Sequence, residues 1–357
     1  MGTQATTTRV PFLDLGAIHG DLKDDLLEAF SALIDSGAFI NGPQVREFEE
    51  AFADYVGTTE AIGLASGLDA LRLALLAMGI ERGDEVLVPA NTFVATLEAV
   101  TQAGGVPVPV DMSETDWNID VAAAESAIGE KTRFLLPVHL YGQMADMRAL
   151  VTLADRHHLT VLEDACQAHG ATREGFAAGT LGAAAAFSFY PGKNLGAFGD
   201  AGALTTNNAA LADVVRALRE HGQRAKYKHE REGWTARLDT IQAIVLSAKL
   251  ARLDGWNEER RAIARHYLER LAGVGDLDLP PVAADSEPVW HLFVVRTADP
   301  DAVHLTEAYR GLGYERGAFP VAERHADRVL SLPIFPGMTI EAADAVVAAV
   351  LAFFDGD

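Results

Sequence analysis

Two side chains of complementary chemistry stand at the ends of two short apolar runs in this sequence. Asp164 closes the run Thr160–Asp164, and Lys193 follows the run Ala183–Tyr190 across a Pro-Gly turn. If the runs form neighbouring strands, their carboxyl ends open onto one crevice, where open α/β sheets bind ligands. Pyridoxal phosphate requires such a pair, because a lysine holds its aldehyde as a Schiff base and a carboxylate keeps its ring nitrogen protonated. We therefore predict a pyridoxal-phosphate site with Lys193 and Asp164 as its catalytic residues.

The glycine-rich segment around Lys193 has two other possible interpretations. A phosphate-binding P-loop requires a glycine five residues before Gly192 and a serine or threonine after the lysine. Phe187 and Asn194 stand at those positions, so the P-loop is excluded. When this segment is considered alone, Lys193 could also be an ordinary solvated lysine in a turn. The surrounding residues favour the cofactor.

The turn at residues 66–68 could bind a phosphate group. Ser66, Gly67 and Leu68 follow a predicted strand and open a predicted helix. Free backbone N–H groups at a helix N-terminus attract anions, and glycine lets a ligand approach the backbone closely. A capped turn without a ligand is the alternative. Ser188, at the end of the strand before Lys193, could add a hydroxyl to the same phosphate or be only a small strand residue.

Two further residues have the chemistry to contact the ring of the cofactor. Gln167 lies one turn after Asp164 and could donate a hydrogen bond to a ring oxygen, although a surface glutamine is the plain alternative. Phe93 stands at a strand-to-helix junction, where its ring could cover a flat ligand. Core packing is the alternative for Phe93.

The segment 216–237 is basic within an acidic chain. It holds seven lysine and arginine residues against three glutamates, together with two histidines. A local basic patch in such a chain favours a polyanionic substrate over a chance solvated face. A nucleoside diphosphate would suit this patch.

Length and composition limit the possible classes of protein. The chain has 357 residues with 49% hydrophobic content, and a single core usually stops growing at about 250–300 residues. Its net charge of −22 opposes nucleic acids and anionic membranes as partners. Cys166 is the only cysteine, which predicts no disulfide and a cytoplasmic location. We expect no metal site, because the histidines lack metal-ligand spacing, and no membrane span, because no apolar stretch approaches roughly 20 residues.

Short apolar runs alternate with helical patterns from residue 20 to about 220, which predicts parallel βαβ construction. We therefore predict an α/β fold with a large domain, residues 1–250, in which helices flank a mostly parallel seven-stranded sheet and residues 1–9 form a loose tail. The predicted strands are 61–65, 85–89, 106–111, 133–138, 160–163, 184–189 and 202–206.

A helical pattern that begins near Leu238 and runs toward Leu271 connects this domain to the rest of the chain. One clear strand, Trp290–Arg296, and a closing helix with apolar residues from Val346 to Phe354 follow it. We therefore predict a smaller α+β domain at residues 251–357.

Several motifs of the chain together resemble a known family, the nucleotide-sugar aminotransferases of the DegT/DnrJ/StrS group, which are fold type I pyridoxal-phosphate enzymes. The resemblance covers nearly everything from Val10 to Arg296 and resumes near Leu305. Ser66–Leu71 and Asn91–Thr96 are most similar to members that aminate position 3 of a keto-deoxysugar. The motifs that carry the resemblance are Pro11–Asp14, Gly42–Pro43 with Phe48–Glu49, Gly83–Val86, Val138–Gly142, Glu163–Gly170, Phe187–Gly196, Arg237–Asp239 and Leu330–Pro333.

The resemblance implies an activity and partners. L-glutamate would give its amino group to a nucleoside-diphosphate keto-sugar, in antibiotic, O-antigen or other glycan biosynthesis. Pyridoxal phosphate would be the cofactor, and the free amine of Lys193 would move a proton between the donor α-carbon and the cofactor. The protein would be a homodimer whose active site is shared between subunits.

The resemblance also implies roles for single residues. Asp164 would pair with the ring nitrogen and Gln167 with the ring hydroxyl, while Phe93 would stack on the ring. The phosphate would be held by Ser66, Gly67, Leu68, Ser188 and Thr235. The expected substrate contacts are Tyr190, His221, Lys226, Arg237 and His304.

The chain departs from the family pattern at two places. Thr235 stands where the family has an asparagine that reaches the phosphate in the partner subunit, and a threonine hydroxyl reaches less far and offers one donor instead of two. The family also places a helix, a strand and a substrate loop after the strand 290–296. This chain lacks roughly 20 such positions, so the small domain is predicted to be shortened near 297–306. Both departures motivate an alternative, a cofactor-binding but catalytically impaired regulatory or scaffold homologue.

Overall fold

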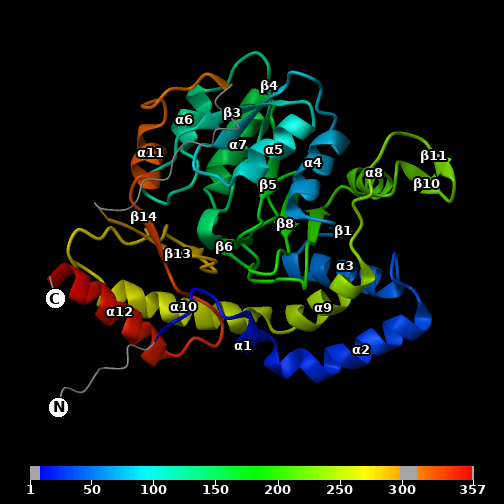
Figure 1. Cartoon of the computed structure of the whole chain (residues 1–357). Coiled ribbons are helices and arrows are strands. Elements are labelled where there is room, and N and C mark those ends of the chain that lie inside the picture. Colours follow the sequence, from blue (N-terminus) through cyan, green and yellow to red (C-terminus); the bar gives the residue numbers. More distant parts are fainter. Residues whose placement is uncertain (1–8, 298–311, 356–357) are drawn as a thin grey trace.

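A seven-stranded sheet lies at the centre of the protein. The computed structural model describes residues 9–297 and 312–355 (Figure 1). The strands run in the spatial order β1-β9-β8-β5-β4-β2-β3. All seven predicted strands are present, with small differences at their ends: β1 (Glu60–Leu64), β2 (Glu85–Pro89), β3 (Val106–Val110), β4 (Thr132–Leu135), β5 (Thr160–Asp164), β8 (Ala184–Ser188) and β9 (Gly202–Thr206).

The sheet is mostly parallel, as predicted, but β9 is an exception. It pairs antiparallel with both of its neighbours, β1 and β8. Parallel neighbours need a crossover connection, usually through a helix, whereas residues 189–201 return directly from β8 to β9 without one. The expectation of βαβ construction along the whole run was therefore wrong at this connection, which is the loop that carries Lys193.

Helices cover both faces of the sheet (Figure 1). Side chains alternate between the two faces of a strand, so Ala61 and Leu87 join one core cluster while Ile62 and Val86 join the other. The first cluster contains α3 (Pro43–Val56), α6 (Val121–Ser126), α7 (Met147–His157) and α9 (Thr240–Leu250). The second contains α4 (Gly67–Ala77), α5 (Val94–Gln102) and α8 (Ala209–Arg219).

A separate core lies around the C-terminal elements. It is built from α10 (Leu253–Arg270), β13 (Phe293–Arg296), β14 (Val329–Leu332) and α12 (Ile340–Asp355). The single helix expected from Leu238 toward Leu271 is in fact two, because α9 packs on α3 and α2 while α10 packs on α12. The strand expected at Trp290–Arg296 begins only at Phe293. The division into residues 1–250 and 251–357 stays a prediction.

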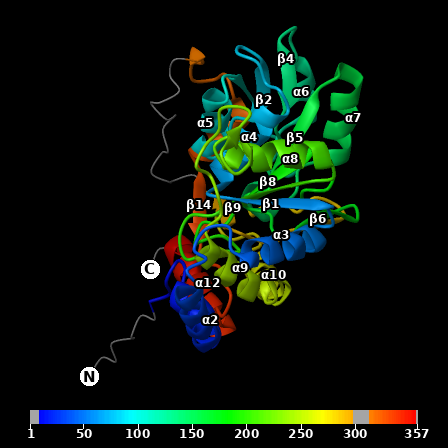
Figure 2. The same ribbon diagram turned by 90° about the vertical axis from the view of Figure 1, so that its right-hand side faces the viewer.

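The remaining helices and strands complete the described chain. In Figures 1 and 2, α2, α9, α10 and α12 lie together at one end of the molecule, and β4 and α6 lie at the other. The remaining elements are α1 (Leu15–His19), η1 (Gly20–Leu22), α2 (Lys23–Ser36), η2 (Leu140–Gly142), β6 (Thr172–Arg173), β7 (Phe176–Ala177), β10 (Gln223–Ala225), β11 (Lys228–His229), β12 (Ser286–Glu287) and α11 (Pro320–Ala326).

Two searches of the described residues gave negative results. No helix among residues 9–297 and 312–355 is long and apolar enough to cross a membrane. Within the same ranges no group of three or more His, Cys, Asp and Glu side chains could hold a metal ion. The predicted loose tail, except Arg9, and the predicted shortening near 297–306, except Thr297, lie outside the described residues.

Phe52 tests the packing of α3 on the sheet. Its ring is fully buried and lies edge-on to Phe187 and Phe189, with ring centroids 5.1 Å apart in both pairs. We expect Phe52→Ala to lower the free energy of unfolding by about 3–5 kcal/mol, because a cavity remains beside β8. Urea unfolding measures the loss. Phe176→Ala, at a ring that is 40% exposed, is the control and should change stability far less; equal losses would contradict the packing.

Candidate active site

The predicted catalytic pair comes together at the carboxyl ends of two adjacent strands. β5 pairs in parallel with β8, and Asp164 stands opposite Ala186. Lys193 lies in the loop that follows β8, where its backbone N–H donates to Tyr190 O at 2.8 Å. Burial lowers the pKa of Lys193, and Asp164 lies close enough to oppose that change. The two residues therefore lie at the same edge of the sheet, and their catalytic roles stay a prediction.

Asp164 is held by two donors. Thr96 Oγ1, on α5, donates to Asp164 Oδ2 at 2.9 Å, and the backbone N–H of Cys166 donates to Oδ1 at 3.2 Å. Each carboxylate oxygen has a second lone pair, so the buried carboxylate can still accept a hydrogen bond from a ring N–H. The sequence analysis missed Thr96. Its only signal was a hydroxyl in the first turn of a helix that follows a sheet strand.

A buried histidine and glutamate clamp the end of β5. His139 Nε2 lies 2.9 Å from Glu163 Oε2, and the backbone N–H of Ala145 donates to His139 Nδ1 at 3.2 Å. Because Nδ1 accepts, the proton of a neutral imidazole is on Nε2 and is donated to Glu163. The backbone of His139 also donates to Asp164 O at 3.0 Å. This clamp fixes the backbone of Asp164, the next residue after Glu163 and the predicted catalytic carboxylate.

Glu163 is kept ionised inside the protein. Burial acts to raise its pKa, but hydrogen bonds from His139 and from the amides of Gly182 and Gly179 outweigh burial and hold the pKa below the ordinary value. Leu181 N–H also donates to Glu163 Oε1, at 2.9 Å. A carboxylate that accepts from so many donors is costly to protonate.

The turn before α4 forms a cradle with Ser188. Ser66 caps the helix, because its Oγ accepts from Asp69 N–H at 3.0 Å, and the amides of Gly67 and Leu68 have no hydrogen-bond partner among the described residues. A Cβ at Gly67 would lie 2.7 Å from Cys166 Sγ and 2.8 Å from Ser188 Cβ. Only glycine therefore lets this turn lie so close to Ser188, and two free amides beside a serine fit a phosphate group.

Gln167 is oriented by the backbone of Tyr141. Its Oε1 accepts from Tyr141 N–H at 2.7 Å, so its amide NH₂ group is the free end of the side chain. That group can only donate, which suits a ring oxygen of the cofactor. Phe93 is 68% exposed at the N-cap of α5, so the alternative that it packs in the core is wrong. Its role as a cover for the ring stays a prediction.

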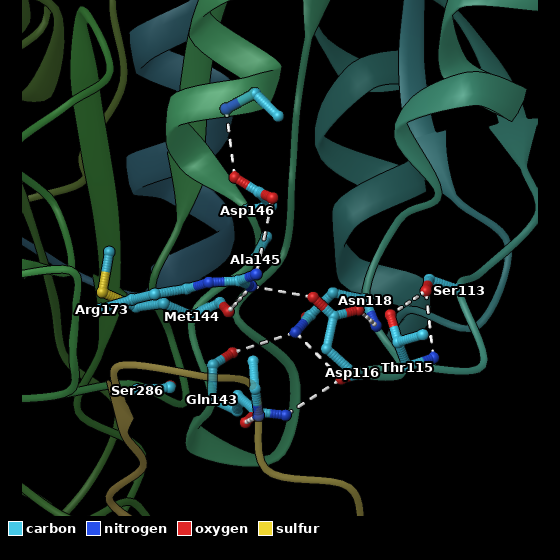
Figure 3. Close-up of polar contacts among 12 residues, drawn as sticks. Ser113, Thr115, Asp116, Asn118, Gln143, Met144, Ala145, Asp146, Arg173 and Ser286 are labelled. Atoms are coloured by element: carbon cyan, nitrogen blue, oxygen red, sulfur yellow. Dashed lines mark hydrogen bonds and ion pairs between the residues drawn. The ribbon is translucent and has the colours of Figure 1, made fainter.

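A polar network that the sequence analysis missed lies around Gln143 and Met144 (Figure 3). Arg173 Nη1 donates to Asp116 Oδ2 at 2.8 Å and to Met144 O at 3.1 Å. Asn118 Oδ1 accepts from the backbone N–H of Leu140 at 3.2 Å. These bonds fix both ends of the segment around Tyr141 and thereby the orientation of Gln167.

The predicted substrate contacts lie apart from the catalytic pair. His221 Nε2 pairs with Thr235 Oγ1 at 3.0 Å, and Arg237 Nη1 donates to Glu220 Oε1 at 2.8 Å. Lys226 stands in the turn of the β10–β11 hairpin, which projects from the body of the molecule (Figure 1). Within one subunit the structure does not bring these residues into contact with Lys193.

The other two predicted substrate contacts are Tyr190 and His304. Tyr190 is 59% exposed in the same loop as Lys193, so it is close in the chain and accessible. His304 lies outside the described residues.

Replacement of Glu163 tests the clamp. We expect Glu163→Gln to cost about 1–3 kcal/mol at pH 7, because the NH₂ group of glutamine would face backbone N–H donors. The folded pKa of Glu163 is depressed, so its contribution is full above the ordinary glutamate pKa of about 4.3 and is lost as pH falls through the folded pKa. The stability gap between wild type and variant, from urea unfolding across pH, should therefore narrow below about pH 4.3.

The exposed Glu174, which pairs with Arg148 at 3.0 Å, provides the matched control. Glu174→Gln should change stability by about 0.5 kcal/mol or less at every pH. If Glu163→Gln lowered the free energy of unfolding by the same amount at pH 7 and at acidic pH, the ionised state of Glu163 would be refuted.

Two relatives of known description cover nearly the whole chain. The dTDP-3-amino-3,4,6-trideoxy-alpha-D-glucose transaminase of Streptomyces venezuelae is 47% identical over 369 aligned positions, which cover 98% of this chain and 97% of that protein. The erythromycin biosynthesis sensory transduction protein EryC1 of Saccharopolyspora erythraea is 46% identical, with 96% of this chain and 99% of that protein covered.

Two solved structures of similar proteins share the fold. DesV of S. venezuelae, solved in complex with a ketimine intermediate, superposes with a TM-score of 0.95 at 47% identity and covers 98% of this chain and 99% of that chain. NtdA of Bacillus subtilis, solved with bound cofactor PMP, gives a TM-score of 0.90 at 31% identity, with 99% of this chain and 86% of that chain covered. The family profile matches residues 21–302 and 299–351. The chain therefore belongs to the DegT/DnrJ/EryC1/StrS aminotransferase family.

Proposed function

We propose that the protein is a pyridoxal-phosphate-dependent aminotransferase that converts a nucleoside-diphosphate keto-sugar to the amino-sugar, with L-glutamate as amino donor. The observation that carries the proposal is the placement of Lys193 and Asp164 at the ends of the adjacent strands β8 and β5. Family membership supports it, as does the sugar transaminase activity of the relative from S. venezuelae. A role in antibiotic-sugar or other glycan biosynthesis and a cytoplasmic location complete the proposal.

The residues of the crevice would hold the cofactor in one orientation. Asp164 would accept from the ring N–H and Gln167 would donate to a ring oxygen. The amides of Gly67 and Leu68 with the Ser188 hydroxyl would bind the phosphate, while Ser66 shapes the turn. Phe93 would cover the ring. When bound, pyridoxal phosphate supplies the electron sink that acidifies the α-carbon of the amino donor.

Lys193 would be the group that moves the proton. A neutral amine can accept a proton from the donor α-carbon, whereas an ammonium cannot. Burial lowers the pKa of Lys193, which increases the neutral fraction of the amine near pH 7 relative to a solvated lysine. The negative charge of Asp164, which would hold the ring nitrogen, acts in the opposite direction and raises the pKa of Lys193.

A homodimer with a shared site would complete the pocket. Four apolar side chains are exposed beside the Lys193 loop: Phe39 (52%), Ile40 (48%), Phe198 (43%) and Ile241 (40%). They stand on neighbouring segments, because Ile40 forms a β-bridge with Asp239 and Gln242 accepts from Phe198 N–H at 2.8 Å. We name these four side chains the apolar patch. Such a patch supports a second copy of the chain as its partner.

The basic hairpin supports the same arrangement. Lys226 and the pair of His221 and Thr235 lie on or at the base of a hairpin that projects from the subunit (Figure 1). In a dimer such a hairpin could reach the crevice of the partner subunit and meet the phosphates of the cofactor and of the nucleotide. Arg237 is engaged with Glu220 and would contact the substrate only after this ion pair opens.

A regulatory protein is the second candidate. The relative EryC1 is an erythromycin biosynthesis sensory transduction protein. Thr235 in place of the family asparagine, and the predicted shortening near residues 297–306, also favour this candidate. Both candidates bind the cofactor, but only the first converts it.

Half-reaction spectra test the proposed activity. We expect the protein to gain a visible absorption band with pyridoxal phosphate and to lose that band when glutamate is added. Lys193→Ala should abolish the band and slow amino transfer by at least about 10²-fold, because the covalent anchor and the proton carrier are the same amine. Lys131→Ala, at an exposed lysine, is the control and should behave as wild type.

The possible outcomes separate the candidates. A wild-type protein without a visible band would refute the cofactor site. A band that glutamate does not change would support the regulatory candidate. If glutamate converts the cofactor, mass spectrometry of products from a panel of nucleotide-linked 3-keto and 4-keto sugars identifies the substrate.

The apolar patch predicts the oligomeric state. We expect the wild type to sediment as a dimer and the double variant Ile40→Lys/Ile241→Lys to bind its partner at least about 100-fold more weakly, because four ammonium groups would meet across the interface. Analytical ultracentrifugation over a concentration series measures this change. Phe176→Lys, on the small sheet with β6, is the control. A monomeric wild type, or an unchanged double variant, would contradict the shared site.

A further inference from the structure

The loop that carries Lys193 is closed at its base by one peptide unit, which joins Gly196 to Ala197. The N–H of this unit, on Ala197, donates to Phe189 O at 2.8 Å. Gly196 also lies against Pro191, because a Cβ at this glycine would clash with the carbonyl group of the proline. The loop therefore folds back on itself, with Lys193 between its two closed ends.

The carbonyl of the same peptide unit is held by a buried lysine. Lys249, on α9, is 2% exposed, and its Nζ donates to Gly196 O at 2.5 Å. Gln242 lies two turns before Lys249 on the same face of α9, and its Oε1 accepts from Phe198 N–H at 2.8 Å. Helix α9 thus binds two successive peptide units of the Lys193 loop.

The amine of Lys249 meets three electron-rich groups. Besides Gly196 O, its Nζ lies 2.9 Å from His19 Nε2 and 4.9 Å from the centre of the Phe198 ring. The ring of His19 stands edge-on to the ring of Phe198, with centroids 4.7 Å apart. An ammonium has three N–H donors, so one can serve the carbonyl, one the imidazole and one the face of the aromatic ring.

The charge of Lys249 is buried without a counter-charge. Burial lowers the pKa of Lys249 to about 8, so the amine is still mostly protonated at pH 7. Burial and the neighbouring Lys249 lower the pKa of His19 to about 4, so its imidazole is neutral at pH 7 and Nε2 can accept. No carboxylate pairs with Lys249 among residues 9–297 and 312–355. A buried cation of this kind opposes folding, which indicates that it serves something other than stability.

We propose that Lys249 is a positioning residue for Lys193. Its ammonium, oriented by His19, holds the peptide unit between Gly196 and Ala197 and so fixes the backbone of the loop that carries Lys193. The effect on cofactor attachment and amino transfer rests on the proposed function, whereas the order of the loop is a property of the chain alone.

Two substitutions of Lys249 separate its hydrogen bond from its packing. Methionine fills nearly the same space but has no donor, so Lys249→Met leaves Gly196 O without its partner. The amide NH₂ group of glutamine is a neutral donor, so Lys249→Gln can keep the bond to Gly196 O. Lys131→Met, at an exposed lysine, is the matched control. Urea unfolding checks that all three variants fold.

The first readout is amide hydrogen exchange in the full-length protein, followed by mass spectrometry of peptides from the Lys193 loop. The N–H groups of Ala197 and Phe198 report the two bonds at the base of the loop. We expect both to exchange at least about 10-fold faster in Lys249→Met and to stay within about 3-fold of wild type in Lys249→Gln. This measurement needs neither amino donor nor substrate.

The second readout is the rate at which the visible band forms after pyridoxal phosphate is added. A loop that is no longer fixed places Lys193 correctly for only part of the time, so Lys249→Met should form the band at least about 10-fold more slowly. Lys249→Gln and Lys131→Met should form it at nearly the wild-type rate. A wild type without a band would contradict the proposed function, and hydrogen exchange would then decide the present proposal by itself.

The outcomes differ in what they say of Lys249. Faster exchange and slower band formation in Lys249→Met, both largely reversed in Lys249→Gln, support the proposal. Unchanged exchange in Lys249→Met would overturn it, because the loop would then be held without this lysine. Equal acceleration of exchange in both variants would overturn it too, since lost packing would explain both. So would faster exchange combined with a band that forms at the wild-type rate, because the order of the loop would then not matter to Lys193.

Variants of His19 cover the case in which the Lys249 variants do not fold. His19 is only partly buried, at the end of the short helix α1. His19→Phe keeps a ring beside Phe198 but removes the acceptor, whereas His19→Gln offers its amide oxygen to the ammonium. We expect the N–H of Ala197 to exchange about 3-fold faster in His19→Phe and at the wild-type rate in His19→Gln. Equal exchange rates in these two variants would overturn the proposal.

Discussion

The parallel pairing of β5 with β8 is the constraint on which the rest of the site depends. It sets Asp164 opposite Ala186 and so brings the carboxylate to the end of the strand that leads into the Lys193 loop. The direct return of that loop into β9 explains why this strand is antiparallel to its neighbours.

Buried polar groups around this pair work as supports, each tied to a backbone atom. Glu163 and His139 clamp the end of β5, and Thr96 reaches Asp164 from α5. Asn194 and Asn257 connect the Lys193 loop to α10. Each of these side chains is hydrogen-bonded to a backbone carbonyl or amide, or to a side chain that is itself bonded to the backbone. The fold therefore sets the orientation of Asp164 and of the loop that carries Lys193 without a ligand.

The fold was largely predictable, and the reasons are local. The strand runs are short, apolar and bounded by turn residues, so β2 and β9 were placed without error in their bounds. The expectation of one helix from Leu238 toward Leu271 failed because apolar periodicity does not reveal that α9 and α10 pack on different cores. For Phe93 the sequence likewise left two possibilities, because only the packing around the ring shows whether it is exposed or part of the core.

The sequence by itself determined which chemical groups are present and which ends of strands carry them, because residue type and hydrophobic period are local properties of the chain. It could not tell which donors meet Asp164, since Thr96 is 68 positions away, or which carbonyl Lys249 holds, since Gly196 is 53 positions away. Hydrogen bonds between such distant residues exist only after the sheet and its helices have packed, so tertiary structure alone decides the orientation and protonation of the groups that the sequence names.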